Sequence, residues 1–475
     1  MDRLSALDAE FLHLEDEIAH MHIAGACVFA DPPPAFADVN RLVASKLHLI
    51  PRYRQRVRGV PFELGRPVWV DDPHFDLGYH LRHVALPKPG DDATFCQLMG
   101  RLMSHPLDRE RPLWETWLVE GLEGGRWALV FKIHHCMVDG IAGVELLGVL
   151  LDTDPDRAVG APEPWEPRPE PGGAAKVLDA WAGLVGDAIS GVRGLVHAVS
   201  HPTQGARSAV GAARGLARFA GDLRATPKLS IEGTIGPHRA WAHSSASLRD
   251  VRTIRDAFGG TINDVVLAAV SAGYRALLVS RDEDADEAVI RSMVPVSTRH
   301  DDGHGVPDNR VSTLLYDLPV NVADPEERLR LVHEQMTELK SSHMAEAGEV
   351  VTTIGNLAPP MVVGTLSRLA IRAMHQLPQR TVNTVTTNVP GPQFALYCLG
   401  REMLEYRPFV PISHGVRVST AILSYNGSLY FGITGDLTTA ADVDVLAAGV
   451  SDAIEQLRRL ALARLDTTAT ANPSA

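Results

Sequence analysis

Cysteine is scarce in this chain of 475 residues. There are only four cysteines, which lie far apart and form no CxxC pair: Cys27, Cys96, Cys136 and Cys398. This pattern is typical of a reducing compartment and argues against a zinc knuckle. Basic residues are also in the minority, because 45 lysines and arginines stand against 58 acidic residues, a formal net charge of −13. That balance argues against a nucleic-acid-binding protein but leaves room for a local patch that binds a phosphate-bearing co-substrate.

Several targeting and cofactor signals are absent as well. No apolar run reaches the roughly 18 residues of a membrane span, and residues 1–5 do not open a secretory signal. The sequence contains no GxGxxG, GxxxxGK[ST] or GxSxG motif and no lipidation motif. We therefore expect a cytoplasmic protein that lies at most peripherally on a membrane or a lipid droplet.

The length and the proline distribution predict two domains, because 475 residues exceed one ordinary core. Six prolines fall between residues 152 and 173, where they prevent a helix or a central strand. We predict an N-terminal domain over 1–152, a Pro-rich linker and helical crossover over 153–235, a C-terminal domain over 236–465, and a disordered tail over 466–475.

Helical and strand patterns mix without strict alternation, which favours an α+β fold over a Rossmann fold. Helices are predicted at 8–17, 36–47, 141–151, 174–199, 203–225, 247–258, 262–279, 325–345 and 440–462. Strands are predicted at 26–30, 68–70, 127–135, 288–296, 311–318 and 382–388. Asn426-Gly427 predicts a hairpin within 416–432. The apolar face of 177–196, which includes Trp181, either packs on the protein or lies on a lipid surface.

The most informative motif is His134-His135 followed by Asp139-Gly140. It comes after an apolar, strand-like run, and on a strand the two imidazoles would point to opposite sides of the sheet. Only one of them would then face a reaction cavity. The other, with Asp139, would hold the local structure, and Gly140 would allow the bend before the next helix.

Histidine has the chemistry for proton transfer, because it titrates near neutrality and can take a proton from a hydroxyl group and return it. A zinc site is one alternative, but helical zinc sites place histidines at i and i+4, whereas adjacent histidines on a strand diverge. A buried pair that only satisfies backbone groups is another alternative. The added Asp and Gly at fixed spacing favour the base, and no metal site is expected.

Further motifs occur in order along nearly the whole chain. They are Leu4-Ser5-Ala6-Leu7-Asp8 with Phe11-Leu12 and Met21-His22, Ser104 to Leu107, Arg111 to Glu115, Thr261-Ile262-Asn263-Asp264, and Asn388-Val389-Pro390-Gly391-Pro392. With the histidine motif, they make the chain resemble the bacterial wax ester synthase/diacylglycerol acyltransferases. This family lies within the CoA-dependent acyltransferase superfamily, which also includes chloramphenicol acetyltransferase and peptide-synthetase condensation domains.

The resemblance implies two chloramphenicol-acetyltransferase-like domains, each a mixed sheet with helices, with a tunnel at their interface. It implies that His135 is the general base, that His134 is structural, and that Cys136 carries no acyl group because transfer is direct. Asp139 would pair with an arginine, for which Arg54 is the best match and Arg299 the second choice. The alternative for Arg54 is a solvated surface cation.

The resemblance also implies that Asn263, Asp264, Asn388, Pro390 and Gly391 contact substrate. The Asn263 amide would donate to the developing oxyanion or position the acceptor. Asparagine is also a good helix cap, so Asn263 could equally cap the helix that begins near residue 265, and the two roles could coexist. Residues 388–392 would form a stiff turn with or without a role in the site.

The implied function is transfer of a long-chain fatty acyl group from acyl-CoA, a co-substrate rather than a bound cofactor, to diacylglycerol. The expected partners are these two substrates, with no nucleic acid. Wax ester synthesis on a long-chain alcohol is the first alternative. A catalytically silent lipid-binding paralogue and a condensation-type enzyme acting on carrier proteins are the others. Intact His135 and Asp139 argue against the silent paralogue.

Overall fold

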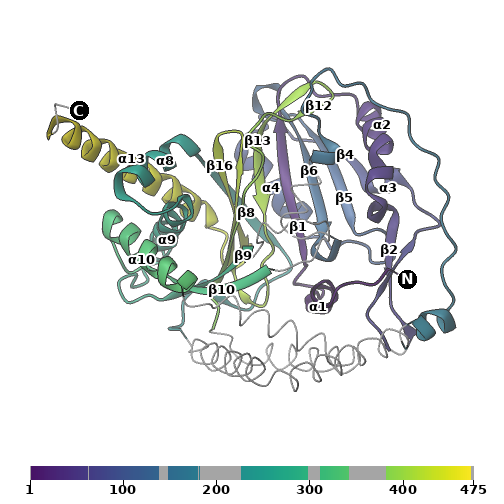
Figure 1. Cartoon of the computed structure of the whole chain (residues 1–475), viewed down its shortest axis with the longest axis horizontal. Coiled ribbons are helices and arrows are strands. Elements are labelled where there is room, and N and C mark those ends of the chain that lie inside the picture. The colour runs from purple at the N-terminus through teal and green to yellow at the C-terminus, as the bar shows by residue number, and fades with distance from the viewer. Residues whose placement is uncertain are drawn as a thin grey trace, which may run out of the picture.

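A computed structural model describes residues 2–61, 64–137, 148–179, 181, 226–297, 311–341 and 381–471. Two six-stranded sheets lie side by side (Figure 1). Both sheets contain parallel and antiparallel pairs. The predicted α+β fold with two mixed sheets is therefore confirmed.

The first sheet has the strand order β12-β13-β1-β6-β5-β4. Its strands are β1 (His22–Phe29), β4 (Leu81–Ala85), β5 (Trp114–Glu120), β6 (Trp127–His134), β12 (Tyr397–Cys398) and β13 (Arg401–Phe409). Helix α2 (Phe36–Lys46) packs on one face, and α4 (Asp92–Met103) packs on the other. Strands β12 and β13 belong to the C-terminal part of the chain, so the predicted domain division at 152 and 236 does not follow the sheets.

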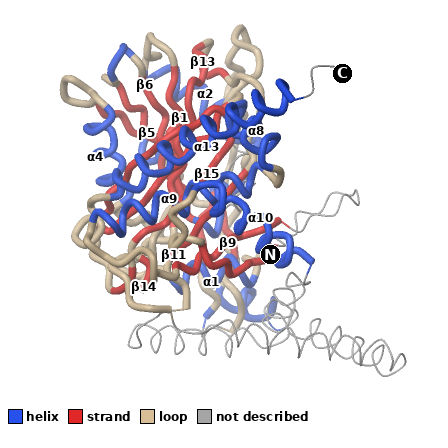
Figure 2. The backbone as a smooth tube through the Cα atoms, turned by 90° about the vertical axis from the view of Figure 1, so that its left-hand side faces the viewer, coloured by secondary structure: helices blue, strands red, loops and turns tan. Residues whose placement is uncertain are grey.

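The second sheet has the order β10-β9-β11-β15-β16-β8. Its strands are β8 (Arg239–Ser247), β9 (Ile290–Ser297), β10 (Val311–Leu318), β11 (Thr384–Val389), β15 (Val418–Tyr425) and β16 (Ser428–Asp436). Figure 2 shows its helices gathered in front of the strands. They are α8 (Leu248–Phe258), α9 (Ile262–Ser280), α10 (Pro325–Ser341) and α13 (Val443–Ala471). Their apolar sides form one core with β8, β15 and β16.

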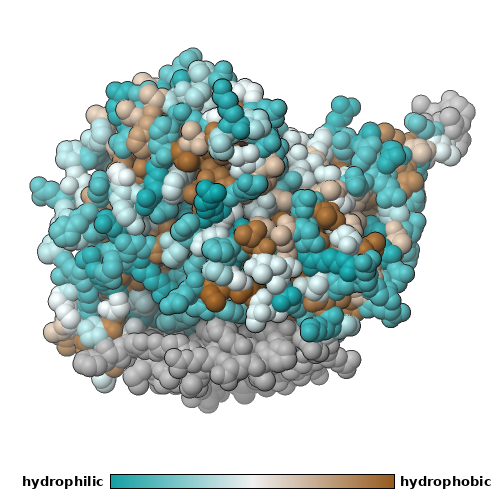
Figure 3. All heavy atoms as spheres, turned by 180° about the vertical axis from the view of Figure 1, so that it is seen from behind, coloured by the Kyte–Doolittle hydropathy of each residue, from teal (hydrophilic) through white to brown (hydrophobic). Residues whose placement is uncertain are grey.

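Smaller elements complete the fold. They are α1 (Ala6–Leu14), α3 (Leu77–His80), η1 (Leu47–Leu49), η2 (Pro51–Arg54), η4 (Glu123–Gly125) and η5 (His135–Met137), with the strand pairs β2 (Gln55–Arg58) and β3 (Val68–Asp71), and β7 (Glu232–Gly233) and β14 (Gly415–Val416). Helix α1 lies below the lower ends of β1 and β6 in Figure 1. Seen from behind, the surface is mostly hydrophilic, with apolar side chains in separate groups (Figure 3).

The predicted hairpin is confirmed. Strands β15 and β16 are joined by Asn426 and Gly427, whose φ angles of 43° and 81° are those of a two-residue hairpin turn. The Pro-rich stretch 153–172 contains neither helix nor strand, as predicted. Its two ends are fixed to the N-terminal half by the ion pairs Lys46–Asp152 and Arg168–Asp71.

Several boundaries differ from the prediction, and three of them concern the histidine pair, the segment before it or the tail. Helix α1 begins after its cap Ser5 and ends at Leu14, earlier than the predicted 8–17. Strand β6 ends at His134, not at residue 135. Helix α13 continues to Ala471, so residues 466–471 of the tail that we expected to be disordered are helical. Most of the predicted helices 141–151, 174–199 and 203–225 lies outside the described residues.

Candidate functional site

The two histidines of the motif lie where β6 ends. The main-chain N–H of His134 donates to the Leu113 carbonyl at 2.9 Å, and that of His135 donates to the Met21 carbonyl at 2.8 Å. His135 opens the short helix η5. The strand therefore ends between the two residues. The prediction that their rings lie on opposite faces of the sheet assumed a continuous strand, and this assumption does not hold.

His134 is fixed through both of its ring nitrogens. Its Nε2 lies 3.2 Å from Glu15 Oε2, and its Nδ1 accepts a 3.1 Å hydrogen bond from the Cys136 main-chain N–H. A ring nitrogen that accepts a hydrogen bond carries no proton, so the proton lies on Nε2 and is donated to Glu15. The side chain is 0% exposed. Neither ring nitrogen is left to take a proton from a substrate.

Glu15 follows α1 and is held by Arg109, whose Nε and Nη2 donate to Oε2 at 3.1 and 2.6 Å. Burial on its own would raise the pKa of Glu15. The hydrogen bonds from His134 and Arg109, together with the positive charge of Arg109, outweigh burial and lower this pKa to about 2. Glu15 therefore stays an ionised acceptor at neutral pH. The sequence analysis missed both residues, because 94 positions separate them and neither belongs to a recognisable motif.

The ring of His135 stacks on Phe11, with ring centroids 4.0 Å apart and planes inclined at 25°. Phe11 and Glu15 are four residues apart at the end of α1, a spacing that brings side chains to one side of a helix. This one segment therefore contacts both histidines. The neighbouring Cys136 is buried among apolar side chains, and burial raises the pKa of its thiol. The neutral thiol is a poor nucleophile.

Three basic side chains surround the C-terminal end of α4, next to the histidine pair. Lys132 donates to the Leu102 carbonyl at 2.9 Å, and His22, paired with His134 across the sheet, contacts the Met103 carbonyl at 3.0 Å. His20 contacts the Ser104 carbonyl at 3.3 Å. These contacts satisfy carbonyls that a helix end leaves unpaired. Burial lowers the pKa of Lys132 to about 8, and burial and the charge of Lys132 lower the pKa of His22 well below its usual range.

Asn263 and Asn388 are brought together by α9 and β11. The Asn388 side-chain amide donates to Asn263 Oδ1 at 3.0 Å. The cap of α9 is Thr261, whose hydroxyl accepts from the Asp264 N–H at 3.2 Å while Asp264 Oδ2 accepts from the Thr261 N–H at 2.8 Å. The alternative that Asn263 caps this helix is therefore wrong.

Asp264 has structural partners in the folded chain. Besides its part in the cap, its Oδ2 lies 2.9 Å from His333 Nδ1. The turn with Pro390 and Gly391 is also tightly built, because a Cβ at Gly391 would lie 2.2 Å from the Ser424 carbonyl oxygen. The Gly391 N–H donates to Ser424 Oγ at 3.1 Å. That Asp264, Pro390 and Gly391 contact substrate remains a prediction.

Arg54 is 8% exposed, so the alternative of a solvated surface cation is wrong. Its guanidinium lies 4.7 Å from the centre of the Trp165 ring, which comes from the Pro-rich linker. Asp139, Gly140 and Arg299 lie outside the described residues. The pairing of Asp139 with Arg54 or Arg299 therefore remains a prediction.

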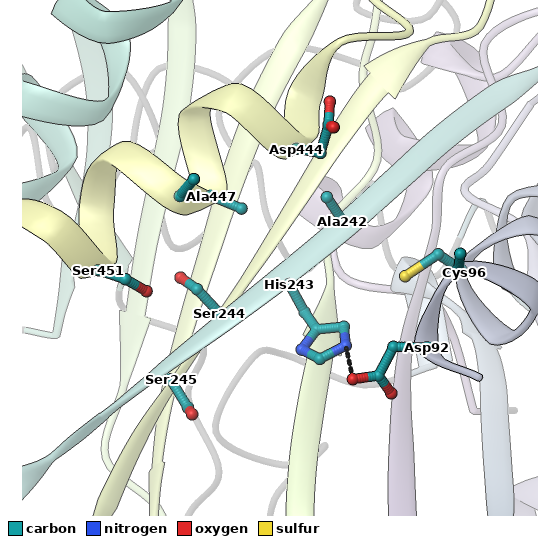
Figure 4. A pocket seen from close by; sticks show the side chains of 11 residues that line it. Asp92, Cys96, Ala242, His243, Ser244, Ser245, Asp444, Ala447 and Ser451 are labelled. Carbon is teal, nitrogen blue, oxygen red and sulfur yellow. Dashed lines mark ion pairs between the residues drawn. The ribbon is translucent and has the colours of Figure 1, made fainter. Parts of the chain in front are cut away.

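A shallow pocket of about 420 Å³ lies at the opposite end of α4 (Figure 4). Asp92, Cys96, His243 and Asp444 line it, and an ion pair of 3.8 Å joins His243 to Asp92. It contains no residue of the motifs, and the length of α4, roughly 17 Å, separates it from the end of the helix that lies next to the histidine pair. Its two acidic side chains do not suit an anionic co-substrate. Within the described ranges, no group of three His, Cys, Asp or Glu residues is arranged to hold a metal ion.

The comparisons with known proteins cover almost the whole chain. Residues 4–266 match the wax ester synthase/diacylglycerol acyltransferase catalytic domain, and residues 308–458 match the WS/DGAT C-terminal domain. The chain belongs to the wax ester synthase/diacylglycerol acyltransferase family. It is therefore an acyltransferase enzyme of lipid biosynthesis, and the predicted family is confirmed.

Individual relatives agree with this assignment. The chain is 37% identical over 470 residues to the probable diacylglycerol O-acyltransferase tgs1 of Mycobacterium tuberculosis, covering 96% of each chain. The solved wax ester synthase/diacylglycerol acyltransferase from Marinobacter aquaeolei VT8 superposes with a TM-score of 0.67 at 25% identity, covering 97% of this chain and 99% of that one. The first condensation domain of the calcium-dependent antibiotic synthetase matches with a TM-score of 0.56 at 17% identity, covering 96% and 95%, a likeness of fold alone.

One helix in the described part of the chain, α9, is long and apolar enough to cross a membrane. Of its apolar window, 67% is buried inside the protein, where α9 packs in the core with α8 and α13. Core helices of globular domains commonly have this composition. Helix α9 is therefore weak support for a membrane span.

Proposed function

We propose that this enzyme transfers a long-chain fatty acyl group from acyl-CoA to diacylglycerol, forming triacylglycerol, with His135 as the general base. The observation that carries the choice of base is the state of His134. Both of its ring nitrogens are engaged, by Glu15 and by the Cys136 N–H. If the histidine pair supplies the base, His135 is therefore the residue that does so.

In the proposed reaction, His135 takes the hydroxyl proton of diacylglycerol as the oxygen attacks the thioester carbonyl. The new C–O bond forms, the C–S bond breaks, and the proton passes to the departing CoA sulfur. General-base catalysis of this kind contributes roughly 10² to 10⁴ in rate. The raised pKa of the Cys136 thiol supports direct transfer without an acyl-cysteine intermediate.

We assign the Asn263 amide to the oxyanion or to the acceptor hydroxyl. Its oxygen accepts from Asn388, which orients the side chain and leaves its N–H groups to donate elsewhere. A preorganised donor to a developing oxyanion is worth a factor of about 10² to 10³. The substrate contact proposed for Asn388 would follow from its position beside Asn263. Pro390 and Gly391 are proposed to contact substrate because they follow Asn388 on the same turn.

Diacylglycerol is insoluble in water, so we propose that the enzyme meets it at a lipid surface as a peripheral protein. Two large apolar side chains of the crossover support this proposal, because Leu178 is 71% exposed and Trp181 is 56% exposed. Tryptophan is enriched where proteins meet the lipid headgroup region.

Product analysis tests the proposal. Purified protein is incubated with radiolabelled palmitoyl-CoA and either dioleoylglycerol or hexadecanol. Labelled triacylglycerol as the main product supports the proposal, and labelled wax ester as the main product replaces it with the alcohol acceptor. Release of neither product indicates a silent paralogue or a carrier-protein substrate.

A further inference from the structure

Glu15 is the described residue best placed to control the geometry of the histidine pair, although the motifs do not include it. The inference drawn from it rests on the proposed function, in which His135 is the base. Glu15 is connected to His135 through His134 and the first turn of η5.

The connection consists of consecutive hydrogen bonds. Arg109 holds the Glu15 carboxylate, which accepts the Nε2 proton of His134 at 3.2 Å. With its proton on Nε2, His134 presents an unprotonated Nδ1 that accepts the Cys136 N–H at 3.1 Å. Cys136 directly follows His135, so this last bond fixes the peptide that joins the proposed base to the rest of η5.

We propose that Glu15 is a positioning residue that acts through His134: it selects the Nε2–H form of that ring and thereby sets the direction of His135. An ionised carboxylate can only accept hydrogen bonds, so it allows only the form with a proton on Nε2. A neutral amide in the same place can donate from its NH₂ group. It then permits the form with a proton on Nδ1, in which the Cys136 N–H loses its acceptor.

The surroundings of Glu15 suit this role. Its side chain is 6% exposed, and its lowered pKa keeps it ionised across the neutral range. Arg109 also connects the carboxylate to the end of α1, because its Nη2 donates to the Leu12 carbonyl at 3.0 Å as well as to Glu15. Phe11, on the same segment, stacks on the His135 ring. The end of α1 therefore fixes the His134 ring by hydrogen bonds and the His135 ring plane by stacking.

The test compares Glu15→Gln with Glu17→Gln, which removes one negative charge from an exposed side chain two positions away. We expect Glu15→Gln to lower kcat about 10- to 100-fold, the range found when a partner that orients a metal-binding histidine is removed. KM for acyl-CoA and for the acceptor should change little. Glu17→Gln should behave as the wild type.

A spectroscopic measurement separates positioning from a loss of folding. Long-range ¹H–¹⁵N spectra of protein labelled at histidine distinguish the two ring forms, and the His134 signals are assigned by their loss in His134→Gln. The wild type should show His134 with its proton on Nε2, and Glu15→Gln should show a loss of that form. An unchanged His134 form, or a kcat equal to that of the wild type, would overturn the proposal.

Arg109→Gln keeps the inference testable if Glu15→Gln does not fold. Arg109 is 50% exposed, so this variant removes the support of the carboxylate without burying a new polar group. We expect a several-fold fall in kcat at constant KM, and an unchanged kcat would contradict the proposal. If the wild type itself made no ester, the proposed function would fail, whereas the His134 ring form would still report on the Glu15 contact.

Discussion

Phe11 and His135 lie face to face, with ring centroids 4.0 Å apart. Stacking of this kind limits rotation of an imidazole about its χ2 angle without using either ring nitrogen. For a histidine proposed to move protons, this is a useful constraint, because the plane of the ring is set while its nitrogens keep their chemistry.

The first prediction concerns the proposed base. His135→Ala should lower turnover by roughly two to four orders of magnitude, the usual contribution of a general base. Acyl-CoA binding, measured by calorimetry, should change little, since the imidazole acts on the acceptor hydroxyl. Retention of most of the activity would show that His135 is not the base.

The second prediction concerns Asp139, expected to pair with Arg54. Arg54 is buried, and removing one member of a buried ion pair costs about 3 to 5 kcal/mol. Asp139→Ala and Arg54→Ala should therefore each lower the melting temperature and the activity.

The double variant decides whether these two residues are partners. If they pair, Asp139→Ala with Arg54→Ala should be no less stable than the worse single variant. Trp165→Ala is a control for Arg54, because it removes the ring under the guanidinium and leaves its charge. Fully additive losses in the double variant would show that Asp139 has another partner, with Arg299 the next to test.

How far the sequence predicts this structure depends on how local each signal is. The hairpin at Asn426-Gly427 was predicted correctly because two residues determine the turn. That β13 belongs to the first sheet was not predicted, because its pairing with β1 joins strands almost 380 residues apart in the sequence. In the same way, the histidine motif can be read from the sequence, whereas the contacts of Glu15 and Arg109 with it became visible only when folding brought distant segments together.

The third prediction is a loss of stability in mild acid. The folded-state pKa of His22 lies below its unfolded value near 6.5, because the residue is buried beside the Lys132 charge. Unfolded protein therefore binds more protons as the pH falls below about 6.5. The free energy of unfolding is therefore highest above this pH. Below it, the free energy of unfolding falls by up to about 1.4 kcal/mol per pH unit for one group. His20 should add to the effect, since burial and the Arg239 charge lower its pKa as well.

Urea unfolding at pH 7.5 and at pH 5.5 measures this loss. His22→Gln keeps a donor for the Met103 carbonyl but does not titrate, so it should reduce the difference between the two pH values. Both measurements lie above pH 5, so Glu15 does not contribute to the difference between them. Its lowered pKa affects the free energy of unfolding only when the pH falls below its unfolded value near 4.5. An equal difference in wild type and variant would assign the acid sensitivity to other groups.

The last prediction concerns the lipid surface. Leu178 and Trp181 lie next to Asp179, which is joined by an ion pair to Arg3 at the N-terminus. Replacing both exposed apolar residues by serine should release the protein from liposomes that contain diacylglycerol, because the loss of buried apolar area weakens interfacial binding. The matched control is Leu462→Ser with Leu465→Ser on α13, which removes two exposed leucines from the far end of the molecule. Sedimentation with liposomes should distinguish the two variants, while their melting temperatures should stay equal to that of the wild type. A fall in melting temperature with undiminished liposome binding would show instead that Leu178 and Trp181 pack against the protein.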